Sequence, residues 1–357
     1  MNTSSNGASF GDDATAPTAS QVATIHKTHR FRLLLQREFW EHKGGFLWAP
    51  LVAGGISLLL TLMAIVIGVI AMRKAIGSGE IKLDDNITIN GLDLGALVSQ
   101  LKPEDMAQLS DGINLSVMSA SIWPFIVLVF VMFFYCLGAL FDERKDRSVL
   151  FWKSLPVSDT ETVLSKVASA VLVAPLLATL ASVLTMFCFL LLISVVVMVH
   201  GGNPFTLLWA NSHPLTLAAQ YLMAIPVYAL WAMPTVGWLL MCSAWAKSKP
   251  FLWAVMIPVF AGIFVAWFQV MGVFDLDSWW FWKNIVLRLL GSVVPITWMD
   301  IDHMQQAGLE TPGALRDLVH PANVYRNLTS PDLWIGVAAG AAMIFAAIRL
   351  RRWRDEG

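Results

Sequence analysis

Residues 167–199 read VASAVLVAPLLATLASVLTMFCFLLLISVVVMV, a run of 33 residues that holds no Asp, Glu, Lys or Arg. At a rise of about 1.5 Å per residue, a helix of this length exceeds the hydrocarbon thickness of a bilayer, which is about 30 Å. A soluble helix of similar length would carry charges on its outer stripe. The stretch therefore predicts a membrane-spanning helix, and it decides the fold class of the chain.

Five further runs are similarly apolar, and we predict an all-α, polytopic membrane protein with six transmembrane helices. None of the 24 Lys and Arg or the 25 Asp and Glu falls inside a predicted span. A charge at the bilayer centre costs about 2.5–3.5 kcal/mol on an insertion scale, so burial in lipid requires this absence. The shortest run, 333–348, needs its flanking residues in order to cross. The predicted spans are 46–72, 116–141, 167–199, 215–245, 251–274 and 333–348.

The composition excludes several classes of protein. Hydrophobic residues make up 57% of the chain and charged residues 14%, whereas a soluble domain carries about 25% charged residues. The formal net charge is −1, so no global field attracts nucleic acid and we expect no nucleic-acid partner.

The distribution of Lys and Arg predicts that both termini lie in the cytoplasm (N-in, C-in). Segments on the side of the termini carry 16 Lys and Arg, against 8 on the other side, as the positive-inside rule expects. We predict that residues 1–25 are a disordered cytoplasmic tail and that 349–357 are a basic cytoplasmic tail. The basic residues of the second tail are Arg349, Arg351, Arg352 and Arg354.

Residues 26–45 predict an amphipathic helix that lies in the cytoplasmic interface. Its apolar face is formed by Phe31, Leu34, Leu35 and Phe39. Glu38 interrupts this face, and Leu33 and Trp40 lie off it. The alternative is a membrane-proximal extension of span 46–72.

Between the second and third spans lies a charged cytoplasmic loop, residues 142–166. Ser158 followed by Glu161 is typical of a capping box. It predicts a helix that starts at Asp159 and continues to about Val199, roughly 60 Å in all. Such a helix would cross the membrane and also project beyond it.

Two outer segments, 73–115 and 275–332, separate other spans. The second predicts a helical insertion between the fifth and sixth spans. Residues 285–294 are apolar except for Arg288 and fit a re-entrant or outer-leaflet helix, provided that protein buries its backbone.

The chain lacks the motifs of ATP hydrolysis and of several enzyme classes. It holds no Gly-x-x-x-x-Gly-Lys-Ser/Thr, no His-Glu-x-x-His and no Gly-x-Ser-x-Gly. No predicted span carries an acid that could relay protons. We therefore expect no enzyme, and any transport must draw its energy from another subunit.

The stretch FDERKDRSVLFWKSLPVS, residues 141–158, resembles the cytoplasmic loop of ABC-2-type exporter permeases. In that family an acid, an Arg and a small residue precede an apolar turn. A Leu-Pro-Val-Ser segment follows, and a Lys enters the next span, here Lys166. The order of the interfacial helix, six spans and outer insertions is also similar to that family.

The resemblance implies a permease subunit in a bacterial inner membrane. Its partners would be a separate ABC ATPase that binds ATP and Mg²⁺, a second permease chain in a homodimer or heterodimer, and membrane lipid; this chain would hold no cofactor. The loop would form a coupling helix against the ATPase, although an amphipathic loop helix on anionic lipid is the alternative. The predicted contacts are Arg144, Asp146, Arg147, Leu150, Phe151, Trp152 and Lys153.

Three further groups of residues are candidates for function. Gly336 and Gly340 permit close helix contact, either at a dimer seam or within the chain. Asp300, Asp302 and His303 form only a weak metal-ligand pattern, because strong sites need more ligands at fixed spacing, so we predict no metal. The third group either lines a pathway for cargo or packs inside the protein; its members are Gln220, Tyr221, Trp231 and Trp238.

These observations favour export of an unidentified amphipathic substrate from the cytoplasm or inner leaflet. One alternative is an ATPase-driven mechanical transmitter that acts on a periplasmic partner without moving cargo. A second alternative is a membrane enzyme whose active site lies in 275–332.

Overall fold

The computed structural model describes residues 27–77, 103–148, 157–272, 277–295, 297 and 320–353. Within these residues the chain is helical, and no strand occurs. Six helical stretches are long and apolar enough to cross a membrane, as a multi-pass membrane protein requires. They are Gly44–Ala71, Gln108–Lys145, Asp159–Val199, Phe205–Trp231, Pro250–Val270 and Pro331–Trp353.

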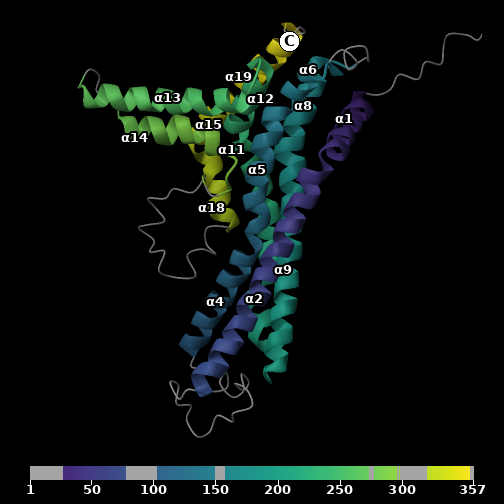
Figure 1. Cartoon of the computed structure of the whole chain (residues 1–357), viewed down its shortest axis with the longest axis vertical. Coiled ribbons are helices and arrows are strands. Elements are labelled where there is room, and N and C mark those ends of the chain that lie inside the picture. Colours follow the sequence, from purple (N-terminus) through teal and green to yellow (C-terminus); the bar gives the residue numbers. More distant parts are fainter. Residues whose placement is uncertain are drawn as a thin grey trace, which may run out of the picture.

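A long bundle of α2, α5 and α9 forms the body of the molecule (Figure 1). Their bounds are α2 Ala49–Gly77, α5 Trp123–Gly138 and α9 Ala174–Val199. Before α2, the chain runs through α1 (Lys27–Glu41) and the π-helical turn η1 (Gly44–Trp48). Only His42 and Lys43 separate α1 from η1. This arrangement resembles the alternative prediction, in which the segment is a membrane-proximal extension of the first span.

The predicted long helix after the charged loop is confirmed. Helix α8 (Asp159–Ala168), the π-helical turn η2 (Ser169–Val173) and α9 form one stretch of 41 residues. The capping box is present, because Ser158 Oγ accepts the Glu161 N–H at 3.1 Å and Glu161 Oε2 accepts the Ser158 N–H at 3.0 Å. These bonds satisfy backbone donors that the first helical turn leaves free.

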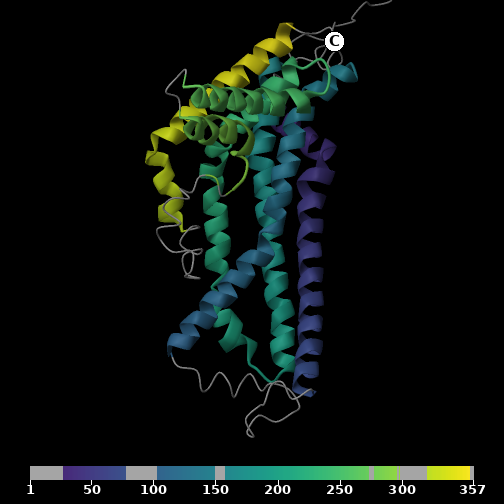
Figure 2. The same ribbon diagram turned by 60° about the vertical axis from the view of Figure 1, so that its left-hand side comes forward.

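The second predicted span is bent near its N-terminal end. Helix α4 (Pro103–Ser121) precedes α5 and leans away from its axis (Figure 2). Pro124 lacks the N–H that would bond the Ala120 carbonyl, and Ser57 Oγ donates to that carbonyl at 2.9 Å instead. Ser182 Oγ donates to the Ser121 carbonyl. Hydroxyl groups of neighbouring helices therefore satisfy the backbone at the bend.

The predicted span 215–245 is two helices, α11 (Pro214–Trp231) and α12 (Met233–Trp245), with a break at Ala232. Two short elements, η3 (Phe205–Trp209) and α10 (Ala210–Ser212), precede α11. Pro234 lies in the first turn of α12. Proline has no N–H to donate to the preceding turn, so it favours the start of a new helix over the continuation of α11.

Helix α13 (Pro250–Val270) runs across the long axis of the bundle (Figures 1 and 2). The predicted span 251–274 is apolar enough to cross a membrane. Its helix is nevertheless not aligned with α2, α5 and α9. Lys249 adopts a left-handed conformation at φ 47° and turns the chain directly before α13.

The helical insertion packs back against α13. It consists of α14 (Ser278–Phe281), η4 (Trp282–Val286) and α15 (Leu287–Gly291). The Trp282 ring lies so close to Gly262 that a Cβ at that glycine would approach within 2.8 Å. The chain then reaches α18 (Pro321–Arg326), the 3-10 turn η5 (Asn327–Thr329) and α19 (Pro331–Trp353).

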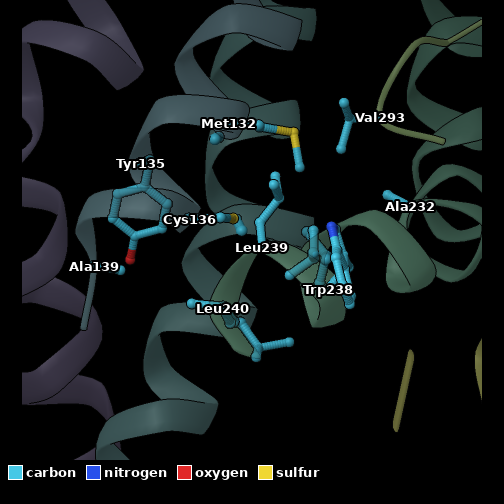
Figure 3. Packing of buried hydrophobic residues seen from close by; sticks show 14 of the residues in the cluster. Met132, Tyr135, Cys136, Ala139, Ala232, Trp238, Leu239, Leu240 and Val293 are labelled. Atoms are coloured by element: carbon cyan, nitrogen blue, oxygen red, sulfur yellow. The ribbon is translucent and has the colours of Figure 1, made fainter. Parts of the chain in front are cut away.

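The main core lies between α5 and α12. In Figure 3, Met132 and Cys136 of α5 lie near Leu239 and Leu240 of α12, and all four side chains are buried. On its other side α12 packs along α19, where Gly237 meets Gly340. A Cβ on Gly237 would approach the Gly340 carbonyl oxygen within 2.5 Å, so glycine permits this helix contact.

We predict that Gly340→Val destabilises the protein, because its Cβ would approach the Met233 carbonyl oxygen within 2.5 Å. Overpacking of this kind costs about 1–3 kcal/mol. Thermal unfolding of the detergent-purified chain measures the effect. Gly68→Val is the matched control, since Gly68 lies in α2 and its Cβ would meet nothing within 4 Å. Equal melting temperatures of the two variants would contradict the close contact between Gly340 of α19 and α12.

Candidate functional site: a buried ionic cluster beside α6

Four charged side chains from four helices are buried together at one end of the bundle. Glu38 comes from α1, Glu143 from α6 (Phe141–Lys145), Lys166 from α8 and Arg351 from α19. Their exposed fractions are 1%, 7%, 2% and 4%. We call these four residues, with their neighbour Asp159, the ionic cluster.

The Glu143 carboxylate lies at the centre of the ionic cluster. Its Oε1 is 3.0 Å from Lys166 Nζ, and its Oε2 accepts a hydrogen bond of 2.6 Å from Arg351 Nη1. Lys166 Nζ also donates to Glu38 Oε1 at 2.8 Å. Arg351 Nε donates to Asp159 Oδ1 at 3.2 Å. Each cation therefore bridges two acids that belong to different elements.

Local structure puts these side chains in place. Asp159 and Glu143 lie in the first turns of their helices, and Arg351 lies in the last turn of α19. These positions suit the helix dipole, which favours acids at the N-terminus and cations at the C-terminus. On α1, Leu34 and Glu38 are four residues apart and both are buried, so the buried face of α1 ends in an acid.

Burial makes each member of the ionic cluster depend on the others. Removing one partner of a buried ion pair leaves an uncompensated charge and costs about 3–5 kcal/mol. The intact cluster need not stabilise the fold more than apolar residues would. The ionic cluster does, however, determine where α6 lies relative to α1, α8 and α19.

On its other side, α6 is attached to α12 through Arg144. Arg144 Nη2 donates to the carbonyls of Ser243 at 2.5 Å and Ala246 at 2.9 Å. These carbonyls lie at the C-terminal end of α12, where a helix has no partners of its own for them. Ser243 Oγ accepts the N–H groups of Leu140 and Phe141 at 3.1 and 3.0 Å. The start of α6 is therefore bonded to the end of α12.

The residues predicted to contact an ATPase fall into three groups. Arg144 is half-buried and bonded within the chain, so its contact with a partner stays a prediction. Asp146 and Arg147 are exposed, and Arg147 has a positive φ of 56°, which is uncommon for a residue with a side chain. The remaining predicted contacts, Leu150, Phe151, Trp152 and Lys153, lie outside the described residues.

Sequence reasoning missed the ionic cluster, because it treated Glu38 as a defect in an apolar face. The structure instead buries Glu38, which also accepts a hydrogen bond of 2.9 Å from Tyr135 OH. Leu33 and Trp40, which lie off the apolar face, are each 60% exposed. The available signal was an acid on the apolar face of a helix, together with a Lys directly before the third predicted span that could pair with it.

The four residues predicted for a cargo pathway are mainly packed inside the protein. Trp231 and Trp238 are buried, and their indole N–H groups donate to Thr297 Oγ1 at 3.0 Å and the Ala254 carbonyl at 2.9 Å. Gln220 is buried, and Tyr221 OH lies 3.2 Å from Ser121 Oγ. These contacts fit the packing alternative for both tryptophans, while a pathway stays a prediction.

The other candidates are also placed. Gly340 faces Met233 of α12, and Gly336 faces Arg288 of α15 and Pro234 of α12, all within the same chain, while a dimer seam stays a prediction. Asp300, Asp302 and His303 lie outside the described residues. Within the part of the chain that the structure describes, no group of three or more His, Cys, Asp or Glu could hold a metal ion.

No family model, no curated protein and no solved structure matches this chain.

We predict that Lys166→Met strongly destabilises the protein, because it leaves Glu38 and Glu143 without their shared cation. The expected loss is about 3–5 kcal/mol in the free energy of unfolding, seen as a lower melting temperature. Lys145→Met removes the same charge from an exposed position of α6 and should change little.

Adding Glu38→Gln to Lys166→Met should restore part of the lost stability, since one buried negative charge is removed. Equal melting temperatures for the Lys166→Met and Lys145→Met variants would show that the ionic cluster does not hold the helices together.

Proposed function

We propose that the chain is the permease subunit of an ATP-driven exporter similar to the ABC-2 type. In this proposal α6 receives the movement of a separate ATPase subunit. The observation that carries it is the double attachment of α6. Glu143 joins α6 to α8 and α19, while Arg144 joins it to the end of α12. A push on the loop after α6 would therefore reach several helices at once.

The surface of α6 supports a docking role. Asp142, Lys145, Asp146 and Arg147 are exposed, so charges of both signs are available to orient a partner. The chain continues into Leu150, Phe151 and Trp152. Large apolar and aromatic side chains of this kind often supply the binding energy of protein interfaces.

The long helix that follows the loop supports transmission across the membrane. It begins at the Ser158 cap and continues without a break in helical structure to Val199. Lys166, in its α8 part, is bonded to Glu143 of α6. A displacement of α6 could therefore tilt this helix as a rigid body.

The remaining parts of the proposal follow from the sequence. ATP and Mg²⁺ would bind to the partner ATPase, because this chain has no phosphate-binding motif. We place the α6 end in the cytoplasm of a bacterial cell, with the chain in the inner membrane beside a second permease chain. Aromatic spans favour an amphipathic cargo over a simple ion.

The first experiment is a pull-down of the tagged chain from its native host in mild detergent, with mass spectrometry and an ATPase assay. A soluble ATPase that co-purifies and hydrolyses ATP would support the proposal. Stimulation of that hydrolysis by a cargo would favour export, whereas capture of a periplasmic protein would favour mechanical transmission. Failure to capture an ATPase, even after crosslinking in the intact membrane, would refute it.

We predict that Arg147→Glu and Leu150→Asp each reduce ATPase capture at least about tenfold, as loss of an interface anchor does. Both variants should still insert in the membrane, because neither residue belongs to the ionic cluster. Arg349→Glu is the control, since it makes the same change of charge at an exposed arginine of another helix, α19. Unchanged capture in both loop variants would remove the coupling role from this loop.

A further inference from the structure

Outside the ionic cluster, the charged side chain of Arg288 in α15 also lies against the core, near the start of α12 and α19. Its guanidinium carbon is 3.8 Å from the centroid of the Trp231 ring. Its Nη2 donates to the Asp332 carbonyl at 2.8 Å. Sequence reasoning treated Arg288 as the one charge in a short apolar segment, and the structure turns that charge toward the helices.

Hydrogen bonds to the backbone hold this segment in position. Thr235 Oγ1 donates to the Arg288 carbonyl at 3.0 Å and accepts the Ser292 N–H at 2.9 Å. Tyr228 OH donates to the Val293 carbonyl at 2.8 Å. Because side chains of α11 and α12 bind both sides of the turn after α15, the position of Arg288 is fixed by the core.

The opposite wall leaves room for the guanidinium. A Cβ at Gly336 of α19 would overlap Arg288 Nη2 and approach Pro234 Cγ within 3.0 Å. Gly336 thus has a function beyond helix contact, because any larger residue would displace the Arg288 side chain.

The charge of Arg288 is incompletely satisfied. Its Nη1 is buried and has no hydrogen-bond partner among the described residues, and it forms no ion pair with their carboxylates. Burial lowers the pKa of the Arg288 guanidinium, although nearby Asp332 opposes this shift. A buried, charged donor without an acceptor is costly, and in native proteins it commonly marks a water, ion or ligand site.

We infer that Arg288 and Trp231 form a binding site for the anionic group, a phosphate or carboxylate, of an amphiphilic molecule. The planar guanidinium suits such oxygen pairs, and stacking on Trp231 holds it in one orientation. Leu287, the preceding residue in the chain, is 56% exposed, so α15 also carries accessible apolar surface. The site does not depend on any ATPase, so it goes beyond the proposed function.

The test uses the purified full chain alone in a neutral detergent. Native mass spectrometry would measure binding of phosphatidylglycerol and of phosphatidylcholine with the same acyl chains. Oleate and inorganic phosphate test a carboxylate amphiphile and a free anion. We expect phosphatidylglycerol or oleate to bind more tightly than phosphatidylcholine. Arg288→Gln should weaken that binding about tenfold or more, as loss of a charged hydrogen bond does.

Two further variants separate the site from general charge and folding effects. Gly336→Ala keeps every charge but displaces the guanidinium, so it should weaken binding as Arg288→Gln does. Lys283→Gln removes an exposed cation from the same insertion and should leave binding unchanged. Arg288→Lys keeps the charge without the planar fork and should retain part of the affinity.

Three outcomes would overturn the inference. The first is equal affinity of the unaltered chain for phosphatidylglycerol, oleate and phosphatidylcholine, which needs no variant. The second is unchanged anion binding in Arg288→Gln, or equal loss in Lys283→Gln. The third is inorganic phosphate binding as tight as that of the amphiphiles, which would indicate a simple anion site. Since no ATPase is present, these outcomes are independent of the pull-down.

Discussion

The arrangement of helices around α6 depends on a single carboxylate, that of Glu143, shared between Lys166 and Arg351. An apolar bundle has no room for an unpaired charge, so a buried acid requires a buried cation at hydrogen-bond distance. Here the two cations come from helices that are far apart in the sequence. Meeting this one electrostatic requirement therefore brings α6, α8 and α19 together.

The sequence predicted those features of the fold that depend on neighbouring residues. Apolar runs set the length of the spanning helices, and Ser158 with Glu161 set the start of the long one. The ionic cluster was missed because its pairs join residues far apart, such as Glu38 and Lys166. Helical periodicity describes one face of one helix, and it reads an acid on that face as an imperfection.

The orientation of a helix and the helix that it packs against also could not be predicted from local sequence patterns. The spacing of Gly336 and Gly340 predicted a close contact without saying which helix would make it, and α12 within the same chain provides it. Helix α13 has the composition of a span, yet the turn at Lys249 directs it across the bundle. Composition indicates where a helix can be buried, whereas its orientation depends on turns and on the helices it packs against.

Two consecutive residues attach α6 to the rest of the bundle. Glu143 is bonded toward α8 and α19, while Arg144 is bonded toward the end of α12. Moving α6 alone would separate the buried Glu143 carboxylate from its cations and leave buried charges unpaired, which is costly, whereas a solvent-exposed ion pair contributes only about 0–1 kcal/mol. The contacts therefore attach α6 to α8, α12 and α19 at once, and displacing α6 alone would disrupt all of them.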